Sequence, residues 1–169
     1  MKYFAGFIVL AFASQLAFGA SVDLPKRKSG LWEIKISGSA GKSANTMQQC
    51  IDEKTDDMMQ DNVKGMEKSC SKTEIHKDGE RIVSDSTCKV SGSTAKTHSV
   101  FSGRFDSAYK ADIKSTYEPP LHGMHDAATT IDAKWLGPCK AGQKPGDISM
   151  PGMPNINMNE MMKGLGKKP

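Results

Sequence analysis

The sequence lacks most of the features that would assign it an activity. Only 37% of its 169 residues are hydrophobic, which excludes a protein that spans a membrane several times. The net charge of +4 is too small for a dedicated nucleic-acid-binding protein, in which lysine and arginine gather on one face. There is no nucleotide-binding fingerprint, no Gly-x-Ser-x-Gly nucleophile turn and no His-Glu-x-x-His motif. We therefore expect a single domain without catalytic activity and without nucleic acid as a partner.

The N-terminus predicts export. Lys2 precedes an apolar stretch over residues 4–18, and Ala17 and Gly19 suit the −3 and −1 positions of a signal-peptidase site. The stretch is short for a membrane span, so we expect a signal peptide over residues 1–19 that is cleaved after about Gly19. The mature chain then folds outside the cytoplasm and keeps no transmembrane anchor.

The four cysteines all lie in the predicted mature chain, at Cys50, Cys70, Cys88 and Cys139. An even number of cysteines in an oxidising compartment predicts two disulfides. No pair has the Cys-x-x-Cys spacing, which excludes a zinc ribbon and a thioredoxin-type redox motif. Four cysteines allow three pairings.

A predicted hairpin favours one of these pairings. Residues 73–83 read as two short strands that turn at Asp78 and Gly79, a dipeptide suited to a type I′ turn, which sets Ile75 opposite Ile82. The same register brings Cys70 to within one residue of Cys88, and a single bulge closes that gap. We therefore expect Cys70–Cys88 and Cys50–Cys139, the second closing a loop of about 90 residues.

Alternating hydrophobicity predicts an all-β-dominated domain with one helix, built as a curved antiparallel sheet or a partly open barrel. In residues 31–36, Trp32, Ile34 and Ile36 share one face. Further strands are expected over residues 45–50, 89–101, 109–117 and 127–136. We expect turns at residues 102–104 and a strand end at Pro119 and Pro120, because proline cannot donate to a ladder.

Residues 52–69 are the one predicted helix. Asp52 is placed to cap it, and Asp56 and Asp57 fall in its acidic half, which we expect to be exposed. An apolar stripe is expected to pack this helix on the sheet; its members are Met59, Val63 and Met66.

The composition changes after Cys139. Residues 140–169 are rich in Met, Pro, Gly and Lys and lack any periodicity, so we expect a disordered tail. This segment holds five lysines and two acidic residues, a net charge of +3. The domain proper is then expected over residues 20–139, where acidic and basic residues balance.

Three short motifs follow one another in a fixed order. They are Gly-Leu-Trp-Glu at residues 30–33, Gln-Cys-Ile at 49–51 and Leu-Gly-Pro-Cys at 136–139. With a preceding signal peptide and two cysteines in between, the chain resembles domain-of-unknown-function family 3617, a family of exported proteins of Gram-negative bacteria. The resemblance covers about residues 25–139. It implies a periplasmic, disulfide-bonded, β-rich domain, and it carries over no activity, because the family has no established catalytic or binding residues.

The first functional hypothesis is a binding module for a small apolar ligand or an envelope protein partner. A curved sheet with one apolar face and a helix across it can enclose such a ligand. The candidate lining residues are Trp32, Ile34, Ile113, Tyr117, Ile131 and Trp135. The competing interpretation is that these side chains fill a small solid core.

Two alternatives remain open. His122, Met124 and His125 lie close together in a predicted flexible loop and offer ligands for copper or another soft metal. The tail adds thioethers that suit Cu(I), from Met150, Met153, Met158, Met161 and Met162. Without such a metal we expect no cofactor. The last alternative is a structural or stress-related envelope protein without a ligand.

Overall fold

The computed structural model describes residues 25–38, 41–57 and 69–165. The predicted signal peptide lies outside these residues, as does the predicted helical stripe of Met59, Val63 and Met66. Among the helices of the described residues, none combines the length and the apolar composition needed to cross a membrane.

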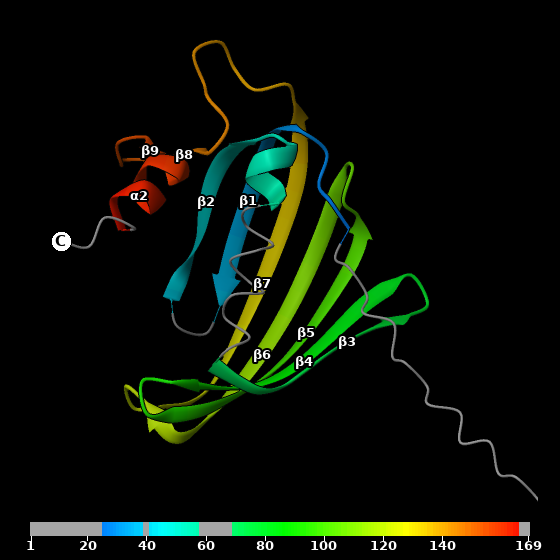
Figure 1. Cartoon of the computed structure of the whole chain (residues 1–169), viewed down its shortest axis with the longest axis vertical. Helices are drawn as coiled ribbons and strands as arrows, with labels where there is room; N and C mark the ends of the chain where they lie inside the picture. The colour runs from blue at the N-terminus through cyan, green and yellow to red at the C-terminus, as the bar shows by residue number, and fades with distance from the viewer. Residues whose placement is uncertain (1–24, 39–40, 58–68, 166–169) are drawn as a thin grey trace, which may run out of the picture.

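The described chain forms one open antiparallel sheet of nine strands (Figure 1). The strand order is β3-β4-β5-β6-β7-β1-β2-β8-β9, so β3 and β9 form the two edges. The bounds are β1 Gly30–Gly38, β2 Gly41–Ile51, β3 Cys70–Asp78, β4 Arg81–Val90, β5 Ser93–Arg104, β6 Ala108–Leu121, β7 Met124–Gly137, β8 Asp147–Ser149 and β9 Ile156–Asn157. The predicted curved antiparallel sheet is confirmed.

The two faces of the sheet differ in chemistry. Strand registers align apolar side chains from five adjacent strands into one row, namely Ile36, Ile131, Ala111, Phe101 and Ile82. Because side chains alternate between faces, the residues between them point the other way and include Lys35, Asp132 and Lys110. We call the apolar side the inner face and the charged side the outer face.

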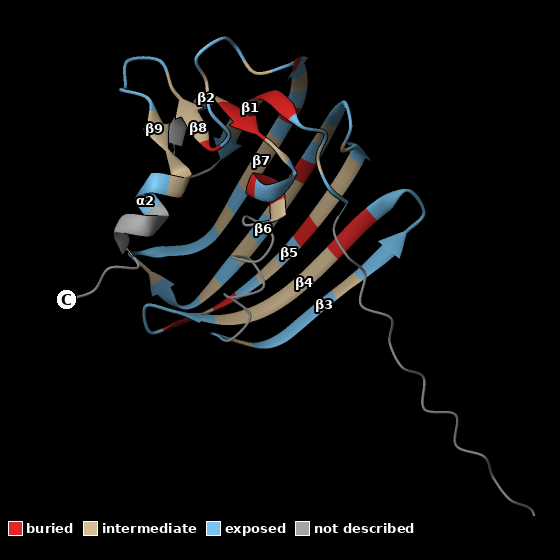
Figure 2. Ribbon diagram, turned by 45° about the horizontal axis from the view of Figure 1, so that its top comes forward, coloured by how far each residue is buried: buried red, intermediate tan, exposed pale blue. Residues whose placement is uncertain are grey.

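The core lies on the inner face near one end of the sheet. Trp32, Ile34, Ile51 and Ala133 form a buried cluster there. Residues 53–57 form a helical turn directly after β2 and lie over this end of β1 and β7 (Figures 1 and 2). Asp52 caps the turn as expected, since its carboxylate accepts a hydrogen bond from the Thr55 backbone NH at 2.8 Å.

The β3–β4 hairpin turns one residue later than predicted. Asp78 pairs with Arg81, so the turn consists of Gly79 and Glu80, and Ile75 faces Ser84 rather than Ile82. Gly79 has a φ of +62°, as the first position of a type II′ turn requires, and the Arg81 guanidinium binds the Asp78 carboxylate across the turn.

Three other strand boundaries also differ from expectation. A turn at Ser91 and Gly92 divides the predicted strand over residues 89–101. The next turn falls at residues 105–107 rather than 102–104. Strand β6 continues through Pro119 and Pro120, because the β6–β7 register is irregular between Thr116 and Leu121 and requires no donor there.

Both disulfides join the cysteines that the hairpin argument favoured. Cys70 lies directly opposite Cys88, and a register shift between Cys70 and Lys72 supplies the expected bulge. The second bond joins Cys50, buried in β2, to Cys139, just after β7.

The segment after Cys139 departs from the predicted disorder. β8 pairs with β2, β9 pairs with β8, and helix α2 (Met158–Leu165) follows, while residues 166–169 lie outside the description. The composition of the segment does not predict these strands and this helix, because contacts with the rest of the fold hold them in place. The disulfide holds the start of the segment beside β2, and the Gly146 NH donates to the Cys50 carbonyl at 2.8 Å.

Gly30 permits the close approach of β1 to the end of β7. A Cβ on Gly30 would lie 2.3 Å from the Gly137 carbonyl oxygen, and its φ of +134° is unfavourable for other residues. We expect Gly30→Ala to lower the free energy of unfolding by about 3 kcal/mol or more, measured by urea denaturation. Gly137→Ala is the control, because Gly137 has a similar φ of +129° but open space around it. Equal losses for the two variants would show that backbone strain alone matters.

Candidate functional site

The strand registers bring all six predicted lining residues to the inner face. Trp32 pairs with Trp135, and Ile34 lies beside Ala133 in the adjoining row. Farther along the same face, Ile131 lies beside Ala111, Ile113 beside Ser99 and Tyr117 beside Ala95. The sequence therefore predicts the correct face, but the six side chains have different surroundings.

Three of the six belong to the packed end of the sheet. Trp32 is fully buried and Ile34 is 5% exposed, so both fill the core rather than line a site. The Trp32 indole NH donates to the Lys28 carbonyl at 2.8 Å. Trp135 is half-buried under the Lys28 ammonium group, which lies 3.7 Å from the ring centroid. For these three residues the solid-core interpretation holds.

The other three are half-buried and lie farther along the inner face, where Ile131 still packs against the core cluster. Ile113, Tyr117 and Ile131 are joined there by two half-buried residues that the sequence analysis did not select, Ile36 and Phe101. Ile36 belongs to the alternation of residues 31–36, whereas Phe101 is placed only by the register with Ala111. We call these five residues the inner apolar patch.

Small side chains surround the inner apolar patch. The row that contains Ile113 also holds Thr129, Ser99 and Ser84. The next row consists of Ala127, Ser115, Thr97 and Ser86. The Thr97 and Ser115 hydroxyl groups hydrogen-bond each other at 2.9 Å, so the polar atoms of this row are partly satisfied within the sheet.

A buried ion pair closes the core end of the inner face. The Arg27 Nε lies 2.7 Å from an Asp56 carboxylate oxygen, and the two side chains are 8% and 3% exposed. The Arg27 backbone NH also donates to Asp56, and the guanidinium reaches the Gln49 side-chain oxygen. The prediction of an exposed Asp56 is wrong, because its turn of the helix faces the core. Burial beside this pair raises the pKa of the Tyr109 hydroxyl.

The basic residues on either side of Arg27 fasten the same segment at the surface. The Lys26 ammonium group lies 3.2 Å from Glu53 and 3.0 Å from Asp57, both on the helical turn. The Lys28 backbone NH donates to the Phe105 carbonyl at 3.0 Å. Residues 26–28 thus bind the helical turn to the end of the sheet, and no local pattern in the sequence predicts these contacts.

A known protein family matches most of the chain. A family model described as "Protein of unknown function (DUF3617)" matches residues 27–139. The chain belongs to the DUF3617 family. No curated protein and no solved structure matches it. The matched residues begin at Arg27, include both disulfides and end at Cys139, so β8, β9 and α2 follow the DUF3617 domain.

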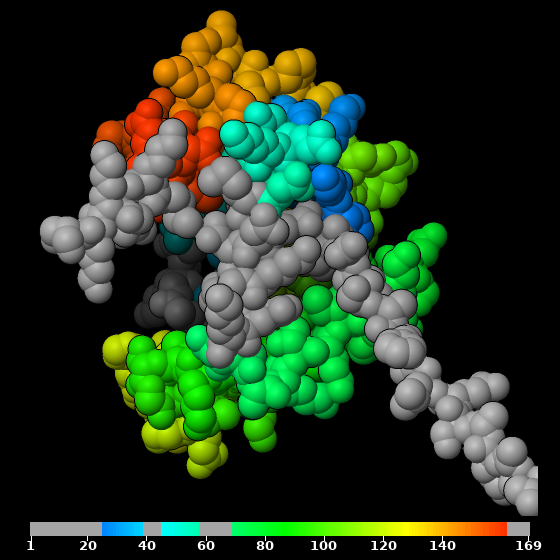
Figure 3. All heavy atoms as spheres, in the orientation of Figure 1, coloured from blue at the N-terminus to red at the C-terminus, as the bar shows by residue number. Residues whose placement is uncertain are grey.

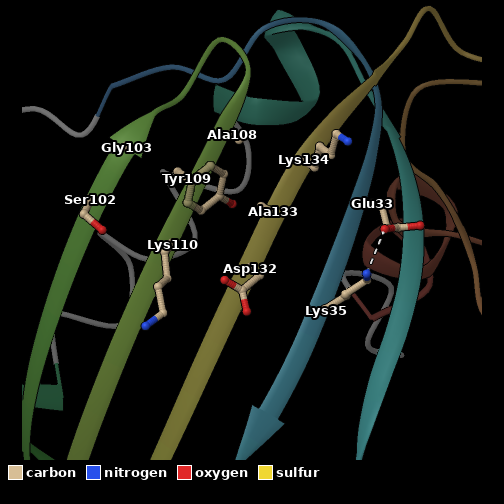
Figure 4. A pocket seen from close by; sticks show the side chains of 10 residues that line it. All are labelled: Glu33, Lys35, Ser102, Gly103, Ala108, Tyr109, Lys110, Asp132, Ala133 and Lys134. Atoms are coloured by element: carbon tan, nitrogen blue, oxygen red, sulfur yellow. Dashed lines mark ion pairs between the residues drawn. The ribbon is translucent and has the colours of Figure 1, made fainter.

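The outer face of the DUF3617 domain carries a shallow groove of about 420 Å³ (Figure 4). Its lining comprises Glu33, Lys35, Ser102, Gly103, Ala108, Tyr109, Lys110, Asp132, Ala133 and Lys134. Opposite charges alternate across the strands, since Asp132 lies between Lys35 and Lys110 in the register. Lys35 is also paired with Glu33 at 3.5 Å. Such an alternating surface is typical of a solvated sheet face, and we assign it no ligand.

The predicted copper segment of the DUF3617 domain is a tight hairpin turn rather than a flexible loop. His122 and Gly123 have φ values of +50° and +80° and connect β6 directly to β7, as in a type I′ turn. His122, Met124 and His125 are all exposed. Within the ranges that the structure describes, no three His, Cys, Asp or Glu residues are grouped so as to hold a metal ion. The copper hypothesis, which also relies on the Met124 thioether, stays a prediction.

Proposed function

We propose that this DUF3617 protein is a non-catalytic binding module that holds one small apolar ligand, such as a single acyl chain, on its inner face. The observation that carries the proposal is the inner apolar patch itself. Five large apolar side chains from four adjacent strands remain only half-buried on the concave side of an open sheet (Figure 2).

The arrangement of side-chain sizes supports a guest at this position. Large side chains fill the core end of the inner face, where Trp32, Ile34 and Ile51 pack together. Between Ile113 and Tyr117 the face carries a row of small side chains from four strands, namely Ala127, Ser115, Thr97 and Ser86. An apolar ligand would contact the patch and remove its surface from water, a gain of about 25 cal/mol per Å².

The predicted export of the chain gives this activity a location. Two disulfides are typical of proteins that fold in an oxidising compartment, and we propose the periplasm. An apolar ligand there is poorly soluble, so a protein that shields it from water has a clear use. An envelope protein that covers the same patch is the competing occupant.

Ile113 is the position at which we expect a single substitution to impair binding most cleanly. Ile113→Glu places a carboxylate in the patch, and burying it under an apolar ligand is costly. We expect it to weaken the binding of a fluorescent fatty acid roughly tenfold or more, measured by titration at equilibrium. Thr116→Glu is the matched control, because it adds the same charge to an exposed outer-face position of β6.

Two results would contradict this proposal. The first is equal affinity of the Ile113→Glu and Thr116→Glu proteins for the fatty acid, which would place any binding elsewhere. The second is a wild-type protein whose melting temperature does not rise with added fatty acid, since a ligand that binds only the folded state must stabilise it.

A further inference from the structure

Strand β3 forms an open edge of the sheet. It pairs with β4 on one side, and within the described residues no strand pairs with its other side. In the space-filling view the β3–β4 hairpin, coloured green, lies away from the orange and red C-terminal residues (Figure 3). The backbone NH and C=O groups on the open side of an edge strand can pair with a further strand.

Contacts at both ends hold this edge strand against β4. At its start, the Cys70–Cys88 disulfide joins the two strands. At its end, the Arg81 guanidinium binds one carboxylate oxygen of Asp78 across the turn. The open edge is therefore fixed in position before any other chain approaches it.

The regular part of the edge spans residues 72–78. These residues pair with β4 in continuous register, whereas Ser71 lies at the register shift. Hydrogen-bonded and non-hydrogen-bonded pairs alternate along an antiparallel strand, starting with a hydrogen-bonded pair at a two-residue turn. The backbone groups of Thr73, Ile75 and Lys77 therefore point to the open side, and Ile75 is the central residue of the regular part.

The side chains of this edge carry both signs of charge in balance. Lys72 and Glu74 are 59% and 60% exposed, and the lysine Nζ lies 3.1 Å from a carboxylate oxygen. Lys77, Asp78 and the formally neutral His76 are exposed as well. Lysine on an edge strand normally opposes pairing with another strand. Here the carboxylates cancel the charge of the lysines, so no net repulsion separates two such edges.

We propose that two copies of this chain associate by antiparallel pairing of their β3 strands, with a twofold axis at Ile75. In this register the regular parts of the two strands overlap along their whole length. Lys72 of one copy then lies opposite Asp78 of the second, and Glu74 lies opposite His76. The twofold axis repeats both contacts. The proposal does not depend on a ligand at the inner apolar patch.

Nearby twofold registers fit less well. An axis at Glu74 sets this carboxylate opposite itself, and an axis at His76 sets it opposite Asp78. An axis at Thr73 brings the irregular position of Ser71 into the pairing. Charge and strand geometry thus select the same register. This self-complementarity favours a second copy of the chain over an unrelated strand as the occupant of the edge.

Sedimentation equilibrium of the oxidised, full mature chain tests the pairing. One strand pair gives a small interface, so we expect a weak, reversible dimer and extend the measurement to about 0.5 mM protein at low ionic strength. Lys72→Glu should weaken the dimer roughly tenfold, because it sets like charges opposite each other twice. Lys96→Glu is the control. Lys96 is exposed in the same outer-face row but lies in β5, away from the edge, and its replacement changes the net charge equally.

A mixture of two variants tests the register itself. Asp78→Lys should weaken the dimer for the same reason as Lys72→Glu, since lysine then faces lysine. When the two variant proteins are mixed in equal amounts, both contacts between unlike copies join opposite charges again. We therefore expect the mixture to dimerise with close to wild-type affinity, although each variant alone associates weakly. Circular dichroism verifies that both variants are folded.

Four outcomes would overturn the proposal. A wild-type protein that stays monomeric at every concentration would exclude the dimer. Equal weakening by Lys72→Glu and Lys96→Glu would assign the association to net charge, and a mixture of folded variants that does not associate would contradict the register. Binding of a synthetic peptide of alternating Thr and Val to β3 of a protein that stays monomeric would assign the edge to a strand of another protein.

Discussion

Replacement of Asp56 by alanine is expected to lower the free energy of unfolding by about 3–5 kcal/mol. The substitution removes the Asp56 carboxylate that faces the buried Arg27 guanidinium, and the two side chains are only 3% and 8% exposed. It also removes the acceptor of the Arg27 backbone NH. Urea denaturation with both disulfides intact measures the loss.

The neighbouring residue supplies the control for this experiment. Asp57 forms an ion pair with Lys26, but both side chains are about half exposed, and such pairs contribute at most about 1 kcal/mol. We therefore expect a much smaller loss for Asp57→Ala than for Asp56→Ala. The double variant Arg27→Met, Asp56→Leu should recover much of the stability, since an apolar pair of similar volume avoids the desolvation of two charges. Similar losses for the two alanine variants would mean that the Arg27–Asp56 pair is accessible to water.

Loss of the Cys50–Cys139 disulfide is the second change with a large expected effect. The bond joins residues 89 positions apart, and loop entropy alone assigns it about 4–5 kcal/mol. The Cys70–Cys88 bond closes only 18 positions, for which the same relation gives about 3 kcal/mol. We expect Cys50→Ala with Cys139→Ala to be the less stable of the two double variants, also because Cys50 is 1% exposed in the core.

Amide hydrogen exchange distinguishes the effects of losing each of the two disulfides. Without the Cys139 bond, β8 loses the link that holds it beside β2, so its amides should exchange faster while those of β4 keep their protection. The Cys70→Ala, Cys88→Ala protein should show the reverse pattern, with fast exchange in β3. A protein that loses protection uniformly in both cases would contradict this division.

The elements with alternating hydrophobicity could be predicted from the sequence. The alternation of Trp32, Ile34 and Ile36 places β1 correctly, and that of Tyr109, Ala111 and Ile113 places β6. The turn of the β3–β4 hairpin could not be located as well. Asp78-Gly79 and Gly79-Glu80 are both acceptable turn dipeptides, and only the cross-strand contact between Asp78 and Arg81 selects the second.

Contacts that form only in the folded chain could not be predicted from a local sequence pattern. Asp56 looks like one acidic residue among several at the start of a helix, and its burial follows only from the position of Arg27 on the neighbouring segment. Ile148 and Ile156 form a pair in β8 and β9, although their surroundings are rich in Pro, Gly and Asn. The same limit applies to Phe101, which joins the inner apolar patch through the register of β5 with β6.

Native mass spectrometry of the protein, purified from its own compartment with its disulfides intact, tests the binding of an apolar ligand most directly. We expect a population heavier than the oxidised chain by the mass of one apolar molecule, and loss of that species in the Ile113→Glu protein but not in Thr116→Glu. A protein that carries no ligand, and that takes up none when a fatty acid is added in excess, would contradict the proposed function.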